Sequence, residues 1–555
     1  MLRTFTRPFP RGRALACAAT VALLPSVATA QQAPAASPAA EVRYDLVITG
    51  GRIVDGTGRP ARTGDVAVRG GWIVRVAAPG ALRSAAAITR IDATGLVVSP
   101  GFVDVHSHAI EEAFKSDKRL NEGVVRQGVT TIVGGPDGYF APFHMRMLLD
   151  SLKHHGSGTN VAMYIGHNGV REAVMGMAQR APTAEELAKM KAMVREGMEL
   201  GAVGLSSGLM YEPGMFSKTD ELVELAKEVA PYRGIYDSHV RDPGHHLIES
   251  DRETIEIGER AGISPKIAHE KVVGLENASL LKDVVALVEG ARARGVNAVT
   301  DQYPYDGAAT AHLEELIVVP EVTAKAPGFD LKALLRDKTQ RPALKESSEH
   351  GINGGFAWLK ATGYSQMRIT SSPENPSLVG QYLSELARAR RVDPFDLVAD
   401  LILGATKPIG ITLGAVREVD VRNLLVKPWN MVASDGAYVD PAEGTRGHPR
   451  SAGTFPRVLG RYVREQHALT LEEAVRKMTS FPADFVGLHD RGRVAEGQAA
   501  DLAIWNPRTI ADQSTWEQPS KMATGMIHVF VGGVAVLKDG AMTGVAPGRF
   551  LAARH

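Results

Sequence analysis

The middle of this 555-residue chain alternates between helix-like and strand-like segments, and this pattern constrains the fold most strongly. Amphipathic stretches at 183–201 and 277–295 are each followed by a short apolar run, at 202–208 and 297–305. Alternation of this kind over about 390 residues is typical of a parallel sheet in which a helix follows each strand. We therefore predict an α/β fold, a (β/α)8 TIM-like barrel, for residues 99–485.

Sequence segments typical of β-strands flank this alternating region at both ends of the chain. Residues 43–98 contain short apolar runs separated by Gly and Asp, and residues 486–548 show the same pattern. We predict that the two ends pair into one small β-sandwich domain, with two independent β caps as the alternative. Residues from about 307–432 do not divide into regular β/α units, which indicates an insertion over the barrel mouth.

The first 42 residues have the composition of a targeting segment followed by a linker. Four arginines within the first 13 residues precede an apolar stretch at 14–27, and Ala-Thr-Ala at 28–30 fits a cleavage site. We predict a signal peptide over 1–30, cleaved near Ala30, a linker over 31–42, and a periplasmic or secreted mature protein. A membrane anchor is the alternative, and the apolar stretch is too short to favour it.

Composition limits the chemistry that the mature chain can use. The single cysteine, Cys17, lies inside the predicted signal peptide, so the mature chain would have no disulfide and no thiolate ligand. Any metal would be held by histidines and carboxylates. The formal net charge of +1 gives no electrostatic reason to expect nucleic acid or an anionic membrane as partner.

Two histidines close an apolar run in "GFVDVHSH". Residues two apart in a strand point to the same face, so His106 and His108 can bind one divalent ion. At the carboxyl end of a barrel strand they would lie on the face that carries catalytic residues. For this motif alone, two surface histidines in a turn are the alternative.

Four other apolar runs also end in a potential metal ligand, namely Asp137, His239, His269 and Asp435. Each of them alone is typical of a structural residue, and Asp137 within "PDG" also suits a turn. Their shared position at predicted strand ends is what favours a common metal site.

The opening "ITGGRIVDGTG … GLVVSPGFVDVHSH" resembles the amidohydrolase superfamily. Further segments resemble its N-acyl-D-amino-acid deacylase (D-aminoacylase) group: "GHNGVREAVMG", "SSGLMYEPG", "SHVRD", "IAHEK", "DQYPYDG", "ASDG" and "HPRSAGTFPRVLGRYVRE". The resemblance covers nearly all of the mature chain, from about Tyr44 to Gly540. The barrel fold and a metal-dependent hydrolase activity are what it implies.

The resemblance implies a role for each candidate ligand. His106 and His108 would bind one metal, and His239 and His269 would serve a neighbouring site. Asp435 would be the catalytic carboxylate and also a metal ligand.

At the position of Asp137 the family commonly has a cysteine that binds or bridges the metals. A carboxylate can also bridge two zinc ions. We expect one or two Zn²⁺ ions, with Mn²⁺ or Co²⁺ as alternatives because oxygen is a harder ligand than sulfur.

Three further residues match family positions that hold the substrate carboxylate, namely Lys271, Tyr303 and Arg450. A guanidinium fork and an ammonium group suit a carboxylate. Tyr305 is the alternative to Tyr303, and pairing of Arg450 with an acid such as Glu443 is the alternative to substrate binding. His167 and Arg171 also follow a strand-like run, where they would line the pocket or serve packing.

The expected function is metal-dependent hydrolysis of the amide bond in N-acyl-D-amino acids, small molecules with a free carboxylate. A bound Zn²⁺ can activate water and polarise the carbonyl, and Asp435 would shuttle the proton. The preference for the D form comes from the resemblance alone. The alternatives are a β-aspartyl or D-dipeptidase, a cyclic-amide hydrolase, and a non-catalytic periplasmic metal- or ligand-binding protein. A non-catalytic binding protein needs no proton shuttle, so the presence of Asp435 disfavours this alternative.

Overall fold

The computed structural model describes residues 43–553, except 111–114, 320–323, 325–327, 353–354 and 440–446. The predicted signal peptide and linker lie outside the described residues. Among the helices that are described, none has the length and apolar content needed to cross a membrane.

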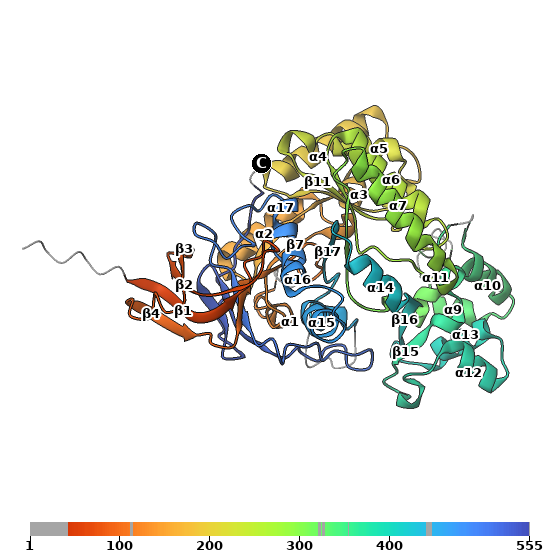
Figure 1. Cartoon of the computed structure of the whole chain (residues 1–555). Coiled ribbons are helices and arrows are strands. Elements are labelled where there is room, and N and C mark those ends of the chain that lie inside the picture. The colour runs from red at the N-terminus through yellow and green to blue at the C-terminus, as the bar shows by residue number, and fades with distance from the viewer. Residues whose placement is uncertain are drawn as a thin grey trace, which may run out of the picture. The chain divides into compact units, whose positions relative to one another are not determined.

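Both ends of the described chain contribute to one nine-stranded sheet (Figure 1). The antiparallel pairing of β5 with β18, in which Val98 lies opposite Ile504, joins the two halves. The two strand-rich ends therefore pair with each other. The N-terminal strands are β1 (Tyr44–Ile53), β2 (Arg62–Arg69), β3 (Trp72–Ala77), β4 (Ala87–Asp92) and β5 (Val97–Pro100), and the C-terminal strands are β18 (Leu502–Trp505), β19 (Met526–Val531), β20 (Val534–Lys538) and β21 (Ala541–Met542).

The middle of the chain forms parallel strands. They pair in two runs, β6-β7-β8 and β9-β10-β11-β12-β13-β17, and only Tyr164 separates β8 from β9. A parallel bridge between Ser107 and Gly436 links the segment after β6 to the segment after β17. All six residues of β7 are buried, as expected for a parallel strand covered on both faces. The strands are β6 (Phe102–Asp104), β7 (Val129–Gly134), β8 (Asn160–Met163), β9 (Ile165–Gly166), β10 (Gly204–Gly208), β11 (Ile235–His239), β12 (Ser264–Ile267), β13 (Val299–Gln302) and β17 (Asn430–Val432).

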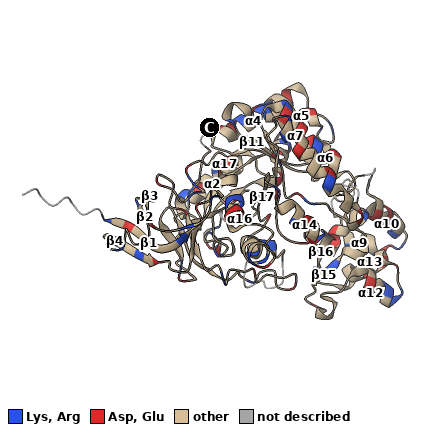
Figure 2. Ribbon diagram, viewed as in Figure 1, with Lys and Arg blue, Asp and Glu red and all other residues tan. Residues whose placement is uncertain are grey.

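Helices connect these strands and carry charged residues of both signs, most visibly on α4, α5, α6 and α7 (Figure 2). Helix α4 confirms the amphipathic stretch seen in the sequence, and it begins with a capping box in which Thr183 and Glu186 bond each other's backbone N–H groups. The helices are α1 (Glu122–Val125), α2 (Pro142–His155), α3 (His167–Met175), α4 (Ala184–Glu199), α5 (Thr219–Ala226), α6 (Leu247–Ala261), α7 (Leu281–Ala293), α14 (Glu418–Leu425), α15 (Arg450–Arg457), α16 (Leu471–Met478) and α17 (Ser480–Phe485).

Between β13 and α14 the chain forms a separate three-stranded antiparallel sheet with its own apolar cluster, which includes Leu313, Ile369 and Val398. This sheet ends at Ala415, earlier than the expected insertion boundary at 432, because β17 pairs with β13 in the parallel set. The elements are β14 (Gly307–His312), α9 (Leu331–Arg336), α10 (Arg341–His350), α11 (Trp358–Thr362), β15 (Arg368–Ser371), α12 (Leu383–Arg390), α13 (Pro394–Gly404) and β16 (Gly410–Ala415).

Asp501 ties the terminal sheet to the parallel strands. Its Oδ1 accepts a hydrogen bond from the backbone N–H of Gly532 at 2.7 Å, and its Oδ2 accepts one from Asn160 Nδ2, in β8, at 3.0 Å. The same carboxylate pairs with Arg491, whose side chain is almost completely buried. One buried carboxylate thus satisfies groups from both sheets, and the arginine depends on it for charge compensation.

We predict that Asp501→Ala lowers the free energy of unfolding by about 3–5 kcal/mol, because Arg491 then keeps only the partly exposed Asp490 as a counter-charge, and groups from both sheets lose their buried acceptor. Urea unfolding followed by circular dichroism measures this difference. Asp490→Ala is the matched control, because Asp490 bonds the same arginine at 3.1 Å but is partly exposed, and its loss should cost less than about 1 kcal/mol. Equal losses in the two variants would contradict the role assigned to Asp501.

Candidate metal centre

Four histidines and two aspartates meet at the carboxyl ends of the parallel strands. His239 is the last residue of β11, and the other five follow a strand by two to four residues. All are buried except His108, whose side chain is 26% exposed and therefore reachable from solvent. The residues and the strands that position them are His106 and His108 after β6, Asp137 after β7, His239 on β11, His269 after β12 and Asp435 after β17. The structure thus brings together every residue predicted as a metal ligand.

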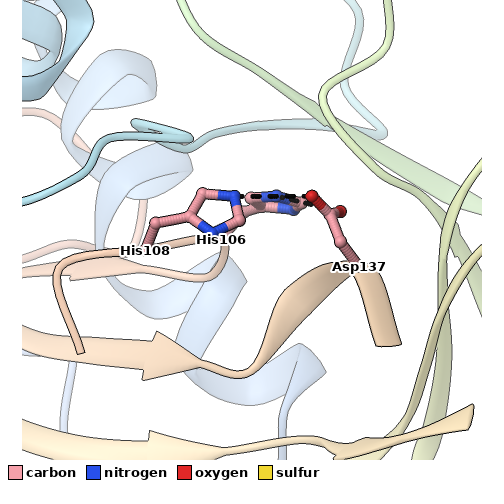
Figure 3. Close-up of side chains that lie close together, drawn as sticks. All are labelled: His106, His108 and Asp137. Atoms are coloured by element: carbon pink, nitrogen blue, oxygen red, sulfur yellow. Dashed lines mark ion pairs between the residues drawn. The ribbon is translucent and has the colours of Figure 1, made fainter. Parts of the chain in front are cut away.

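The first ligand group consists of His106, His108, Asp137 and Asp435. His106 Nε2 lies 3.6 Å from Asp137 Oδ1 and 3.5 Å from Asp435 Oδ1. His108 Nε2 lies 3.4 Å from Asp137 Oδ2 and 3.2 Å from Asp435 Oδ1 (Figure 3 shows both histidines with Asp137). Ligand atoms around tetrahedral zinc are about 3.3 Å apart, given metal–ligand bonds of about 2.0–2.1 Å. The spacing therefore fits one divalent ion.

The second ligand group consists of His239, His269 and the same Asp137. His239 Nδ1 and His269 Nε2 lie 3.5 Å and 3.7 Å from Asp137 Oδ1. The two ring nitrogens are 2.8 Å apart. Asp137 therefore lies between the two groups, where a carboxylate can bridge two ions.

Unpaired polar atoms show that the protein alone does not satisfy this cluster. Both ring nitrogens of His106 and Oδ1 of Asp137 are buried without a hydrogen-bond partner among the described residues. Such atoms cost about 1–3 kcal/mol each when they are left unsatisfied. None of the described residues is a cysteine, so the donors are imidazole nitrogen and carboxylate oxygen alone. This donor set fits Zn²⁺, and it also suits Mn²⁺ or Co²⁺.

The charge states of three residues in the cluster, His106, His269 and Asp435, suit a cation. Burial lowers the pKa of His106 well below its ordinary value and, together with Lys271, lowers the pKa of His269 to about 3. Both rings are therefore neutral, the form that binds metal. Burial alone would raise the pKa of Asp435, but the charge of Arg450 and a hydrogen bond from His108 hold it well below its usual range. The carboxylate is therefore ionised at neutral pH.

Three of the ligand residues have backbone conformations that are uncommon outside glycine. The φ angles are 59° at Asp137, 37° at His269 and 47° at Asp435. Left-handed conformations of this kind cost of order 1–3 kcal/mol and cluster at functional sites. Strain at three converging residues supports a functional role for the cluster.

The residues predicted to hold a substrate carboxylate lie beside Asp435. Arg450 Nη1 is 2.7 Å from Asp435 Oδ2, and the guanidinium carbon lies 4.6 Å from the centre of the Tyr303 ring. Lys271 Nζ lies 5.6 Å from the same ring centre and 2.8 Å from His269 Nδ1. These contacts place two cations and one aromatic ring at the edge of the ligand cluster.

The structure also distinguishes between the alternatives left open by the sequence. Tyr305 bonds Asp512 and Ser514 through its hydroxyl group, so Tyr303 is the tyrosine that contacts Arg450 and Lys271. Glu443, the acid suggested as a partner for Arg450, lies outside the described residues.

His167 and Arg171 do not join the ligand cluster. His167 Nε2 lies 3.0 Å from Glu221 Oε1, and Arg171 Nη1 lies 2.5 Å from Glu221 Oε2. All three side chains are buried. This network links α3 to α5 and serves packing.

Sequence reasoning missed Tyr211, which follows β10. Its hydroxyl group lies 3.4 Å from His239 Nδ1, and the two ring centres are 4.6 Å apart. A cavity of about 1320 Å³ opens beside Tyr211, and Leu209, Phe216, Arg241 and Phe356 also line it. The only signal in the sequence was the position of Tyr211 shortly after an apolar run, which many loop residues share.

The sequence and the fold are both similar to those of known amidohydrolases. The sequence profile of the amidohydrolase family matches residues 357–537. A D-aminoacylase of Alcaligenes xylosoxydans xylosoxydans is 34% identical, over 92% of this chain and 98% of its own length. The crystal structure of an N-acyl-D-glutamate deacylase from Bordetella bronchiseptica, complexed with zinc and a phosphonate inhibitor, gives a TM-score of 0.73 at 30% identity and covers 93% of this chain and 100% of its own. The structure of a D-aminoacylase with a binuclear metal centre gives 0.72 at 32% identity, over 92% and 99%.

We predict that Asp137→Ala weakens zinc binding at least 10-fold, because its two oxygens face all four histidines. Zinc retained after gel filtration, measured by mass spectrometry, tests this. Asp242→Asn is the control: Asp242 is also buried, and its Oδ1 accepts a bond from the backbone of Gly244. Full zinc occupancy in Asp137→Ala would show that Asp137 is not a ligand.

Proposed function

This chain belongs to the amidohydrolase family, in its N-acyl-D-amino-acid deacylase group, and from that premise we propose that it hydrolyses the amide bond of N-acyl-D-amino acids. The observation that carries the proposal is the placement of two cations beside the ligand cluster: Arg450 Nη1 lies 2.7 Å from Asp435 Oδ2, and Lys271 Nζ lies 2.8 Å from His269 Nδ1. Asp435 itself faces His106 and His108 through its other oxygen. A binding protein needs the ligands alone. A hydrolase needs a proton carrier next to a substrate anchor as well, and Asp435 and Arg450 supply this pair.

Asp435 is the proton carrier in this proposal. A bound Zn²⁺ supplies a more acidic water and polarises the scissile carbonyl. Asp435 Oδ1 faces His106 and His108, while Arg450 holds Oδ2 at 2.7 Å. The fixed, ionised carboxylate accepts the proton of the attacking water and transfers it to the amide nitrogen, which leaves as the amine.

The substrate carboxylate binds at Arg450, Lys271 and Tyr303. The guanidinium group lies over the Tyr303 ring, which fixes its plane and leaves edge donors for a carboxylate. Burial lowers the pKa of Lys271 to about 8, so its ammonium group is still largely protonated at neutral pH. The anchor holds the amino-acid half of the substrate beside Asp435, where the departing nitrogen needs its proton.

The same proposal extends to the architecture. The parallel strands would close into a (β/α)8 barrel, and the terminal sheet would form a small β-sandwich domain. The order of parallel pairs, broken only at Tyr164 between β8 and β9, and the bridge between Ser107 and Gly436 support closure of the barrel. The pairing of β5 with β18 supports one domain made from both chain ends.

For localisation we propose a periplasmic or secreted protein whose signal peptide is cleaved near Ala30. The basic residues, apolar stretch and Ala-Thr-Ala pattern in the first 30 residues support it.

We predict that Asp435→Asn lowers kcat by 10²–10⁴-fold, because the amide side chain cannot accept the proton. Initial rates on an N-acetyl-D-amino acid, with zinc content measured on the same samples, test this. Asp512→Asn is the control: Asp512 pairs with Arg457 and bonds Tyr305, outside the ligand cluster. Near-normal turnover by Asp435→Asn with zinc bound would rule out the assignment.

We predict that Arg450→Met lowers kcat/KM for N-acetyl-D-amino acids about 10–100-fold, through loss of a charge-assisted hydrogen bond worth about 1.5–3 kcal/mol. The matching carboxamide substrates should lose much less, which separates carboxylate binding from the effect on Asp435.

The wild type should hydrolyse N-acetyl-D-amino acids in preference to L forms, D-dipeptides and hydantoins. Zinc-loaded protein that is inert towards this whole panel would contradict the proposed function.

A further inference from the structure

A lysine and two aspartates are completely buried on three neighbouring strands next to the ligand cluster. Asp237 lies on β11, Lys266 on β12 and Asp301 on β13. Lys266 Nζ lies 2.9 Å from Asp237 Oδ1 and also pairs with Asp301. Asp237 precedes His239 by two residues, so both point to the same face of β11. The charged trio therefore adjoins the ligands, and one carboxylate oxygen each of Asp237 and Asp301 lies within 4.8 Å of a ring nitrogen of His106.

Asp301 connects this trio to His269. Its Oδ1 accepts a hydrogen bond from the backbone N–H of His269 at 2.6 Å, and its carbonyl oxygen accepts one from the N–H of Glu270 at 2.7 Å. Two successive peptide groups of the segment after β12 are thus held by a single residue of β13. Lys266 pairs with the carboxylate and fixes its position.

The hydrogen bond that Asp301 accepts from the His269 N–H group holds the backbone at a strained position. His269 has a φ of 37°, and without support such a residue relaxes towards the ordinary extended or helical regions. That relaxation would turn the Cα–Cβ bond and move Nε2 away from its place 3.7 Å from Asp137 Oδ1. The carboxylate of Asp301 opposes this movement.

The first ligand group has its own support. The backbone N–H of His106 donates to Asp104 Oδ1 at 3.4 Å, and the same oxygen accepts the N–H of Ser434 at 2.9 Å. The two ligand groups are therefore positioned by different aspartates. Loss of Asp301 should release the backbone of His269 and leave that of His106, which Asp104 holds, in place.

We propose that Asp301, held in place by Lys266, is a positioning residue that keeps His269 aimed at the metal centre and thereby sets the affinity of the ion bound by His239, His269 and Asp137. The inference rests on the metal centre of the proposed function but does not depend on which amide is cleaved. Residues that orient metal ligands in this way typically contribute 10–100-fold to metal affinity.

The test is a zinc titration of the metal-depleted mature chain against a chromophoric chelator, together with thermal unfolding of each variant. We expect Asp301→Ala to weaken the binding of one zinc ion by 10–100-fold. Asp301→Asn keeps an oxygen that can accept the N–H of His269 but loses the ion pair with Lys266, so its zinc affinity should fall less than that of Asp301→Ala. Asp237→Asn is the matched control, because Asp237 shares Lys266 and complete burial but has no hydrogen bond to His269.

The inference is contradicted if Asp301→Ala binds zinc as tightly as wild type, or if Asp237→Asn loses as much zinc affinity as Asp301→Ala. If Asp301→Ala does not fold, Lys266→Met replaces it, because the freed carboxylate should hold His269 less firmly and zinc affinity should again fall. Unchanged affinity in a folded Lys266→Met variant would also overturn the inference. If zinc-loaded wild type does not hydrolyse amides, the proposed function is wrong, but the positioning role of Asp301 is unaffected. The two failures are therefore distinguishable.

Discussion

The position of the Asp137 carboxylate among four imidazoles is the constraint on which the rest of the site depends. Its oxygens lie 3.4–3.7 Å from a ring nitrogen of each histidine, longer than a typical hydrogen bond and close to the separation of ligands around one ion. Buried polar atoms without partners are unfavourable unless a cation completes them. The cluster is therefore understandable as a metal centre and unfavourable as a packing arrangement.

Buried aspartates next to the ligands offset the free-energy cost of this strained, unpaired cluster. Asp104 fastens the strand ends that carry His106 and Asp435, and Asp301 fastens the segment with His269. Each support is a buried aspartate that accepts backbone N–H groups, so the strain at the ligands is offset by residues that adjoin them. The same residues must remain in place for the site to form, which couples stability of the parallel sheet to metal binding.

Much of the site could be predicted because strand ends are local features. The alternation in "GFVDVHSH" and the apolar run before Asp435 are visible in a few residues. The family resemblance, which the comparisons confirm, added the roles. The salt bridges of Lys266 could not be predicted, because they depend on the pairing of three strands that are about 30 residues apart. The extent of the separate three-stranded sheet also depends on pairing between distant segments, since β14 pairs with β16 about 100 residues later.

The most direct test of the central claim is X-ray absorption spectroscopy of the zinc-loaded mature chain at the zinc edge. A centre of four histidines and two aspartates should give a coordination shell of nitrogen and oxygen at about 2.0–2.1 Å, with outer scattering from imidazole rings. Sulfur scattering at about 2.3 Å, or a shell without imidazole, would contradict a centre built from four histidines and two aspartates.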